Sequence, residues 1–348
     1  MPPAIPRSRS TGSAQAPTIK DLGSSLPDSI RRFTPPPRFY PVIATFALFV
    51  GMFGAGSFRY EGFSSPQTIL SVLVDNSFLI VLAVGMTFVI LTGGIDLSVG
   101  SVVALSTMIA ASTLRAGWSA PLVIIAVLLT GSLLGLLMGL VIHYFEIQPF
   151  IVTLAGMFLA RGLCYVISLD AIPIKNETFT SFAQDTIYFG DYFITPSVIV
   201  ALVVLVIAAV VLHMTRFGRT VYAVGGSEQS ALLMGLAVAR TKVGVYVISG
   251  FCSALAGLLF SIYTLSGYNL GAVGMELDAI AAVVIGGTLL TGGSGLVLGS
   301  AVGVLVLGLI QSFISFDGTL SSWWTKITIG VLLLVFVLIQ RLFTRRTV

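Results

Sequence analysis

The chain has 348 residues, of which 56% are hydrophobic and only 9% are charged, and its formal net charge is +4 at pH 7. Soluble domains carry roughly a quarter charged residues, so this composition excludes a soluble globular protein. The basic residues flank apolar runs instead of forming a patch, which argues against a nucleic-acid partner and for a lipid bilayer.

Residues 1–38 differ from the rest because they are rich in Pro, Ser and Arg and poor in apolar residues. Too little apolar surface is available there for folding, so the sequence predicts a disordered, basic cytoplasmic tail. No apolar core and cleavage site of a signal peptide follow its basic residues, and we expect the first spanning helix to direct insertion.

From residue 39 to residue 341 the chain consists mainly of long apolar runs. A span takes roughly 20 apolar residues, and a helix satisfies the backbone in lipid. We predict an all-α polytopic membrane protein with about ten transmembrane helices and Gly-rich breaks, followed by a basic cytoplasmic tail at 342–348. The predicted helices are 39–57, 69–92, 97–114, 121–143, 148–168, 196–214, 243–264, 277–290, 295–314 and 324–341.

Orientation follows from the distribution of Lys and Arg, which concentrate on cytoplasmic loops. With both termini cytoplasmic, the outside receives only Arg59, Arg115, Lys175 and Lys326, and Arg161 falls within a predicted helix. The other basic residues are inside: Arg7, Arg9, Lys20, Arg31, Arg32, Arg38, Arg216, Arg219, Arg240, Lys242, Arg341, Arg345 and Arg346.

The longest outer loop on this topology is 169–195, and the longest inner loop is 215–242. The outer face is acidic, which is consistent either with solvated loop charge or with a docking surface for an external partner. Its acidic residues are Glu61, Asp170, Glu177, Asp185 and Asp191.

A glycine-dense break occurs twice, as LTGGIDLSVGS at 91–101 and as LTGGSGLVLGS at 290–300. Gly-interrupted segments in corresponding places of two halves indicate a transport pathway, whereas small residues at helix contacts indicate packing. The spacing alone leaves both interpretations open. The glycines are Gly93, Gly94 and Gly100 in the first copy, and Gly292, Gly293 and Gly299 in the second.

Two charged residues lie within the predicted membrane region. Asp96 follows the first glycine pair and opens the next helix, where free N–H groups and the helix dipole favour a carboxylate, so we expect a structural cap, with contact to a sugar or ion as the alternative. Arg161 is expected to snorkel or to pair with a carboxylate.

Several kinds of site are missing from the sequence. There is no P-loop motif, and no lysine follows a glycine, so the chain is not expected to hydrolyse ATP. His143 and His213 lie far apart and form no metal motif, while Cys164 and Cys252 lie inside apolar runs, as small core side chains do.

The inner loop 215–242 is basic at both ends and contains a short helical pattern. Ser227 can cap this helix, with Glu228 in its first turn, while Gly235 limits its rigidity. Such a helix can lie on the cytoplasmic surface or dock into the groove of a partner.

Four stretches together resemble the sugar permeases of the ribose/xylose/arabinose ATP-binding-cassette importer family. They are VGMTFVILTGGIDLSVGSVVAL at 84–105, PFIVTLAGMFLARGL at 149–163, GGSEQSALLMGL at 225–236, and GGTLLTGGSGLVLGSAVGVLVLGLIQ at 286–311. Residues 261–287 and 316–327 look closest to one of the two permease chains of bacterial galactofuranose importers.

The resemblance implies a bacterial inner-membrane permease that pairs with a second, different permease chain. It further implies a cytoplasmic ATPase subunit that uses ATP and Mg, and a periplasmic sugar-binding protein, with no cofactor on this chain. The inner loop would be the ATPase-coupling loop, although Glu-Gln-Ser-Ala stands where the family has Glu-Ala-Ala. Its residues are Ser227, Glu228, Gln229, Ala231, Met234 and Gly235.

The mechanism implied is alternating access, in which ATP binding moves the coupling helices and changes which side the path faces. The candidate pathway residues are Asn76, Thr92, Asp96, Tyr263, Tyr268, Asn269 and Thr291. Two alternatives stay open, a secondary sugar–proton symporter and a non-transporting membrane anchor of a cytoplasmic complex.

Overall fold

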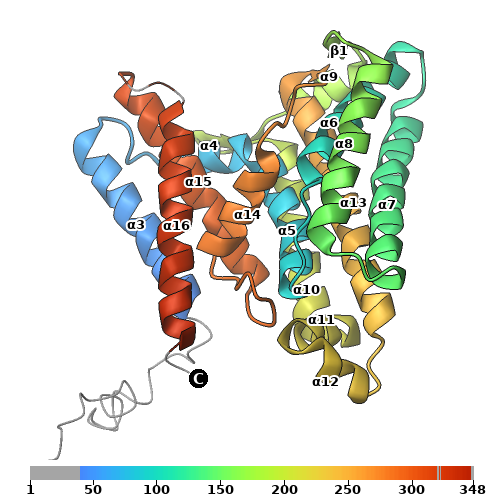
Figure 1. The fold of residues 1–348 in the computed structure, drawn as a ribbon. Coiled ribbons are helices and arrows are strands. Elements are labelled where there is room, and N and C mark those ends of the chain that lie inside the picture. The colour runs from blue at the N-terminus through green and yellow to red at the C-terminus, as the bar shows by residue number, and fades with distance from the viewer. Residues whose placement is uncertain (1–39, 320, 322, 346–348) are drawn as a thin grey trace, which may run out of the picture. The chain divides into compact units, whose positions relative to one another are not determined.

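The computed structural model describes residues 40–319, 321 and 323–345, so the predicted tail at 1–38 and the last three residues lie outside the described part. All ten predicted apolar segments contain helix (Figure 1). Most elements come from them: α3 (Tyr40–Arg59), α4 (Pro66–Asp75), α5 (Ser77–Leu91), α6 (Val99–Arg115), α7 (Ala120–Tyr144), α8 (Pro149–Ile167), α10 (Pro196–Met214), α13 (Val238–Thr264), α14 (Met275–Ile285), α15 (Val297–Asp317) and α16 (Trp323–Arg345).

The number of ten crossings is not confirmed. Six of the described helices are long and apolar enough to cross a membrane, and the bent pair α4–α5 brings the number up to seven. Helices α6 and α14 are shorter, and the 11 residues of α14 rise only about 16 Å, against a hydrocarbon core of about 30 Å. Helix α14 ends before the second glycine-dense break, and α6 begins after the first.

A further difference from the prediction is the bend of 61° between α4 and α5, where one continuous helix was expected over 69–92. Asn76 lies at this bend, is buried, and donates both its backbone N–H and its side-chain amide to the carbonyl of Val72. A short polar side chain that bonds nearby backbone competes with the helix ladder. Gly308 of α15 makes room for this amide, because a methyl group there would lie 2.7 Å from Asn76 Nδ2.

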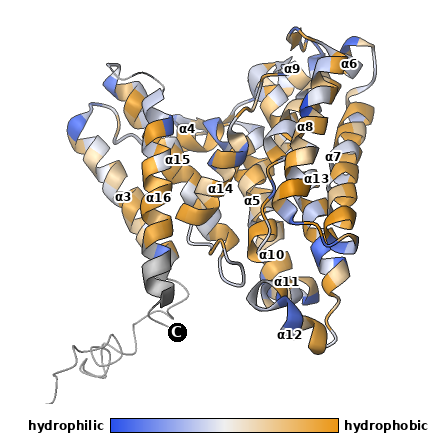
Figure 2. Cartoon of the chain, viewed as in Figure 1, coloured by the Kyte–Doolittle hydropathy of each residue, from blue (hydrophilic) through white to orange (hydrophobic). Residues whose placement is uncertain are grey.

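The core is organised around α5, all fifteen residues of which are buried. A helix that is hydrophobic on all sides belongs inside, and α5 packs against α10, α13, α14 and α15. The outer surfaces of α7, α8, α10 and α16 carry exposed apolar side chains suited to lipid (Figure 2), and hydrophilic residues are prominent at α12 and at several helix ends.

Glycines allow α7 to lie directly against α13. Gly131, Gly135 and Gly139 are spaced four residues apart along α7, a pattern that lets membrane helices approach closely. A methyl group at Gly135 would overlap the carbonyl oxygen of Tyr246, and one at Gly139 would lie 3.0 Å from Val243 Cα.

The connections hold shorter elements, of which the sequence predicted the capped helix of the inner loop, now α12, but not the others. The predicted outer loop contains β1 (Ile172–Pro173), α9 (Glu177–Gln184), and the hairpin of β2 (Ile187–Phe189) and β3 (Tyr192–Ile194), while β1 pairs antiparallel with β4 (Ser266–Gly267). The predicted inner loop folds as α11 (Arg216–Gly226) and α12 (Glu228–Leu233), at the opposite end of the bundle from α9 (Figure 1).

We expect Gly135→Ala to lower the free energy of unfolding by about 1–3 kcal/mol, because the added methyl group meets backbone that cannot rotate away. The measurement is the heat-induced loss of monodisperse protein in detergent. Gly162→Ala on α8 is the matched control, since no atom lies within 4 Å of the added group, and it should be neutral or slightly stabilising. Equal stability of the two variants would contradict close α7–α13 packing.

Candidate functional site

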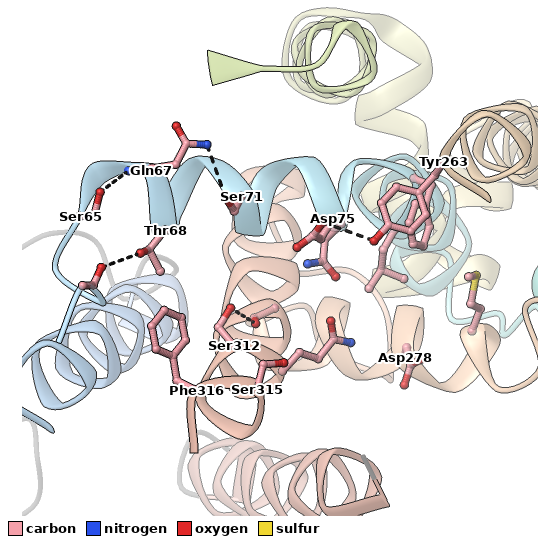
Figure 3. A pocket seen from close by; sticks show the side chains of 17 residues that line it. Ser65, Gln67, Thr68, Ser71, Asp75, Tyr263, Asp278, Ser312, Ser315 and Phe316 are labelled. Atoms are coloured by element: carbon pink, nitrogen blue, oxygen red, sulfur yellow. Dashed lines mark hydrogen bonds between the residues drawn. The ribbon is translucent and has the colours of Figure 1, made fainter. Parts of the chain in front are cut away.

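A polar pocket of about 650 Å³ lies between α4, the start of α5, and helices α13, α14 and α15 (Figure 3). Its walls combine hydroxyl, carboxamide and carboxylate groups with three aromatic rings. Among the described residues that line it, none is Lys or Arg. The polar lining residues are Ser65, Gln67, Thr68, Ser71, Asp75, Asn76, Asp278, Gln311, Ser312 and Ser315, and the aromatic ones are Phe78, Tyr263 and Phe316.

The pocket brings together side chains that are far apart in the sequence. Tyr263 donates its hydroxyl to Asp75 Oδ1 at 3.3 Å, which joins α13 to α4 across the cavity, and its ring lies 5.8 Å from that of Phe78 (Figure 3). On α14, Asp278 accepts from Lys326 Nζ at 2.6 and 2.9 Å. Lys326 neutralises one of the two carboxylates, and the hydroxyl and amide groups of the lining suit a ligand rich in hydrogen-bonding groups.

The structure brings only two of the seven predicted pathway residues, Asn76 and Tyr263, into this pocket. Asn269 is buried and donates its amide to the carbonyls of Ser168 and Leu169, so it fastens the turn after β4 to the end of α8. Tyr268 lies in the same turn and is partly exposed. Thr92, Asp96 and Thr291 lie in the glycine breaks, away from the pocket lining.

Several lining residues were not predicted from the sequence, although a local signal exists for them. Gln67, Ser71 and Asp75 recur every four residues, and residues so spaced share one face of a helix. Gln311 and Ser315 on α15 have the same spacing. Polar residues at this spacing in an apolar helix indicate a polar cavity, but the bend after Asp75 and the contact with α15 required the tertiary structure.

The two glycine breaks lie against each other. The first connects α5 to α6 and the second connects α14 to α15, and Gly293 N donates to the carbonyl of Leu91 at 2.9 Å. Gly292 and Gly293 have φ values of +83° and +75°, a left-handed conformation that glycine adopts without steric cost. The repeat was evident in the sequence, but the direct contact of its two copies was not.

The carbonyls at the end of α14 are satisfied partly by the turn that follows, in which Gly286, Thr288 and Gly287 donate to Ala282 O, Val283 O and Val284 O, and partly by side chains of other helices. Thr45 of α3 donates to Ile285 O, and Gln340 of α16 donates to Val284 O at 3.1 Å. The last carbonyls of a helix have no partner within it, so an interrupted helix in a membrane needs such donors.

The remaining glycines of the repeat allow close approach to different partners. Gly94 faces the hydroxyl of Tyr246, and Gly100 at the start of α6 faces Glu276 at the start of α14. Gly299 faces the carbonyl of Gly286, so α15 begins directly against the end of α14.

Asp96 is completely buried and accepts three hydrogen bonds. Its Oδ1 accepts from Ser98 N at 3.0 Å and from Ser98 Oγ at 2.6 Å, and its Oδ2 accepts from Ser249 Oγ of α13 at 2.7 Å. The N-cap of α6 is Ser98, so Asp96 is not the cap that was expected. The carboxylate instead orders the turn before the cap and ties the first break to α13.

Arg161 on α8 has carbonyl partners. Its Nη1 donates to Asn269 O at 2.6 Å and to Gly271 O at 2.9 Å, so the guanidinium links α8 to the turn after β4. The salt bridges among the described residues are Lys242–Glu228 and Lys326–Asp278, and Arg161 belongs to neither.

Helix α12 exposes an apolar tip on the predicted cytoplasmic side. Ser227 Oγ accepts from Ser230 N at its start, and the N–H groups of Gly235 and Leu236 bond back to Leu232 O and Ala231 O at its end. This end is a Schellman motif, which needs the positive φ of +72° that Gly235 supplies.

Contacts with α11 and α13 hold one face of α12 in place, and its other face is exposed. Glu228 pairs with Lys242 at 2.6 Å, and Ala231 is buried against Val224 and Val238. The exposed residues at the tip include Gln229, Leu232, Leu233 and Met234, of which Leu233 is 82% exposed. An exposed apolar helix end of this kind suits a protein groove.

Residues 68–337 match the family described as the permease component of the branched-chain amino acid transport system, and the chain belongs to this family. Together with the apolar spans, this defines a multi-pass permease subunit of the inner membrane. No solved structure matches the chain.

Curated relatives align over most of their length. The chain is 47% identical over 308 residues to the inner membrane ABC transporter permease protein YjfF of Escherichia coli K12, with 87% of this chain and 92% of the relative covered. Identity is 44% over 308 residues to the fructose import permease protein FruG of Bifidobacterium longum, with 86% and 90% covered. It is 40% over 282 residues to the ribose import permease protein RbsC of Haemophilus influenzae, with 79% and 85% covered.

We expect Asp96→Ala to lower the free energy of unfolding by at least about 2 kcal/mol, because the Ser98 and Ser249 donors lose a buried charged acceptor. Thermal unfolding in detergent measures this. Asp96→Asn keeps one acceptor oxygen and should lose less. Asp170→Ala, which removes an exposed carboxylate, is the control, and a similar loss in that variant would contradict the structural role of Asp96.

Proposed function

We propose that this chain is one of two permease subunits of an ATP-binding-cassette importer that moves an uncharged monosaccharide inward by alternating access. The observation that carries the proposal is the polar pocket, because its lining matches the chemistry of a sugar. The relatives support it, since two of them are named import permeases for fructose and ribose.

The pocket can hold a monosaccharide on chemical grounds. Ligand sites commonly measure about 300–1,000 Å³, and the pocket has about 650 Å³. Sugar hydroxyls can donate to Asp75 and to Asp278 and can exchange hydrogen bonds with Ser312 and Gln311. The rings of Tyr263 and Phe78 supply an apolar face for the C–H side of the sugar ring.

We further propose that the path continues from the pocket towards the glycine breaks, where Thr92 and Thr291 lie. Interrupted helices in two corresponding places are typical of transport pathways, and the two breaks here are in contact. Asp96 serves this path by holding its first break in place. Its oxygens are occupied by Ser98 and Ser249, which argues against the proton-carrying carboxylate that a symporter would need.

Galactofuranose is the substrate that we propose. The two stretches that resemble permease chains of galactofuranose importers, 261–287 and 316–327, supply part of the pocket. Tyr263 and Asp278 come from the first stretch and Phe316 from the second, which also contains the Lys326 that pairs with Asp278. Part of the likeness therefore falls where a substrate would be recognised.

The energy for transport would come from a partner ATPase that binds ATP and Mg, because the sequence of this chain has no P-loop. The apolar tip of α12 is the surface that we assign to this partner.

We propose a second, different permease chain beside this one. The hairpin β2–β3 and the acidic residues Asp185 and Asp191 in the outer loop would face the external sugar-binding protein.

Uptake of labelled sugars into proteoliposomes tests the proposal. The complex would contain this chain together with the permease and the ATPase encoded by neighbouring genes. ATP would be inside the vesicles and the sugar-binding protein outside. We expect ATP-dependent accumulation of galactofuranose, but not of ribose or galactopyranose. Accumulation of another sugar would keep the importer and discard the substrate. Uptake driven by a proton gradient without ATP would indicate a symporter, and assembled complexes with no uptake would indicate an anchor.

Tyr263 gives a sharper test of the pocket. Tyr263→Ala removes the ring and should raise the KM for uptake about 2–10-fold, the equivalent of 0.5–1.5 kcal/mol, whereas Tyr263→Phe keeps the ring and should raise it less. Tyr144→Ala replaces an exposed tyrosine at the far end of α7 and is the control. An unchanged KM in Tyr263→Ala would exclude this pocket from the sugar path.

A further inference from the structure

Four glycines from three segments meet at one point, which we call the glycine junction: Gly93 of the first break, Gly292 and Gly293 of the second, and Gly225 near the end of α11. A methyl group at Gly292 would lie 2.7 Å from Gly93 N and 3.1 Å from Gly225 O. The contact is therefore made by backbone atoms, with no side chain between the segments.

Gly225 sits directly on the hydrogen bond that joins the two breaks. A methyl group there would overlap the carbonyl oxygen of Leu91 and lie 2.5 Å from Gly293 N. These two atoms are the acceptor and the donor of the bond between the breaks. Only glycine allows α11 to reach this bond, because every other residue adds at least the methyl group that would clash.

The same end of α11 is joined stiffly to α12. Ser227 ends α11 and caps α12, so no flexible linker separates them. Val224 of α11 and Ala231 of α12 are buried together with Val238 at the start of α13. A displacement of α12 must therefore move the end of α11, since packed elements shift together and do not deform smoothly.

We infer that the glycine junction is the joint through which a displacement of α12 reaches both membrane breaks, and that Gly225 is its positioning residue. The inference rests on the proposed docking of an ATPase at α12. It adds the route inward, in which α11 presses on the bond between Leu91 and Gly293 and so moves the end of α5 and the second break together. Coupling of this kind is carried by contiguous elements that have two arrangements.

The chain provides its own matched control, because Gly226 follows Gly225 in α11 and a methyl group there meets no atom within 4 Å. The two variants add the same methyl group at neighbouring positions of α11. The backbone of Gly226 also contacts Gly293, but only the methyl group of Gly225→Ala is directed at the hydrogen bond between the breaks. Each would be reconstituted in the complete importer. The measurements are the amount of ATPase subunit bound, ATP hydrolysis with and without sugar-loaded binding protein, and sugar taken up per ATP hydrolysed.

We expect Gly225→Ala to bind the ATPase subunit normally and to lose at least about fivefold in sugar taken up per ATP, the lower end of usual coupling factors. Gly226→Ala should behave as the wild type. A purely structural role would change assembly and would leave this ratio unchanged. A normal ratio in Gly225→Ala, or an equal loss in Gly226→Ala, would overturn the inference.

If Gly225→Ala does not assemble, Gly292→Ala decides by the same criteria, since it enters the junction from the second break. Failure of both variants to assemble would mean that the junction serves folding, and the inference would be withdrawn. A wild-type complex without ATP-driven uptake would refute the proposed function and the inference together, whereas a fully coupled Gly225→Ala would refute the inference alone.

Discussion

The structure depends on how backbone groups are satisfied where membrane helices are interrupted. Lipid offers no hydrogen-bond partner, so every N–H and C=O exposed by a break must find one within the protein. The bond from Gly293 N to Leu91 O joins the two breaks, and the end of α14 is satisfied by the turn that follows it together with the side chains of Thr45 and Gln340. Irregular backbone in the membrane is thereby held at the centre of the fold.

Close packing follows from the same requirement. Backbone can reach backbone only where no side chain intervenes, and glycines therefore lie at the contacts of α7 with α13 and of α11 with both breaks. The wholly buried α5 ends at this meeting point, so the most enclosed helix of the protein leads directly into its most irregular region.

The polar pocket is the second consequence of an interrupted helix. The bend at Asn76 turns α4 away from α5 and presents the face with Gln67, Ser71 and Asp75 to α15. Gln67 also exchanges two hydrogen bonds with the backbone of Phe193 in β3, so the pocket wall and the outer hairpin are held as one piece. A partner that binds the hairpin would therefore contact a segment that is hydrogen-bonded to the pocket wall.

The sequence by itself determined the membrane class, the positions of the apolar helices, the repeated break and the capped helix of the inner loop. These features depend on composition and on spacings within one segment, as with Asp96 before α6 and Ser227 before α12. The sequence did not determine the length of α14 or the bend at Asn76, because both depend on contacts with other helices.

Only the tertiary structure decided that the two breaks touch, that Gly225 lies on their shared hydrogen bond, and that Asp75, Tyr263 and Ser312 enclose one pocket. Each of these contacts joins residues distant in the chain. Whether such residues meet depends on how closely the intervening helices pack, and that is fixed by which glycine faces which backbone, a property that no local pattern contains.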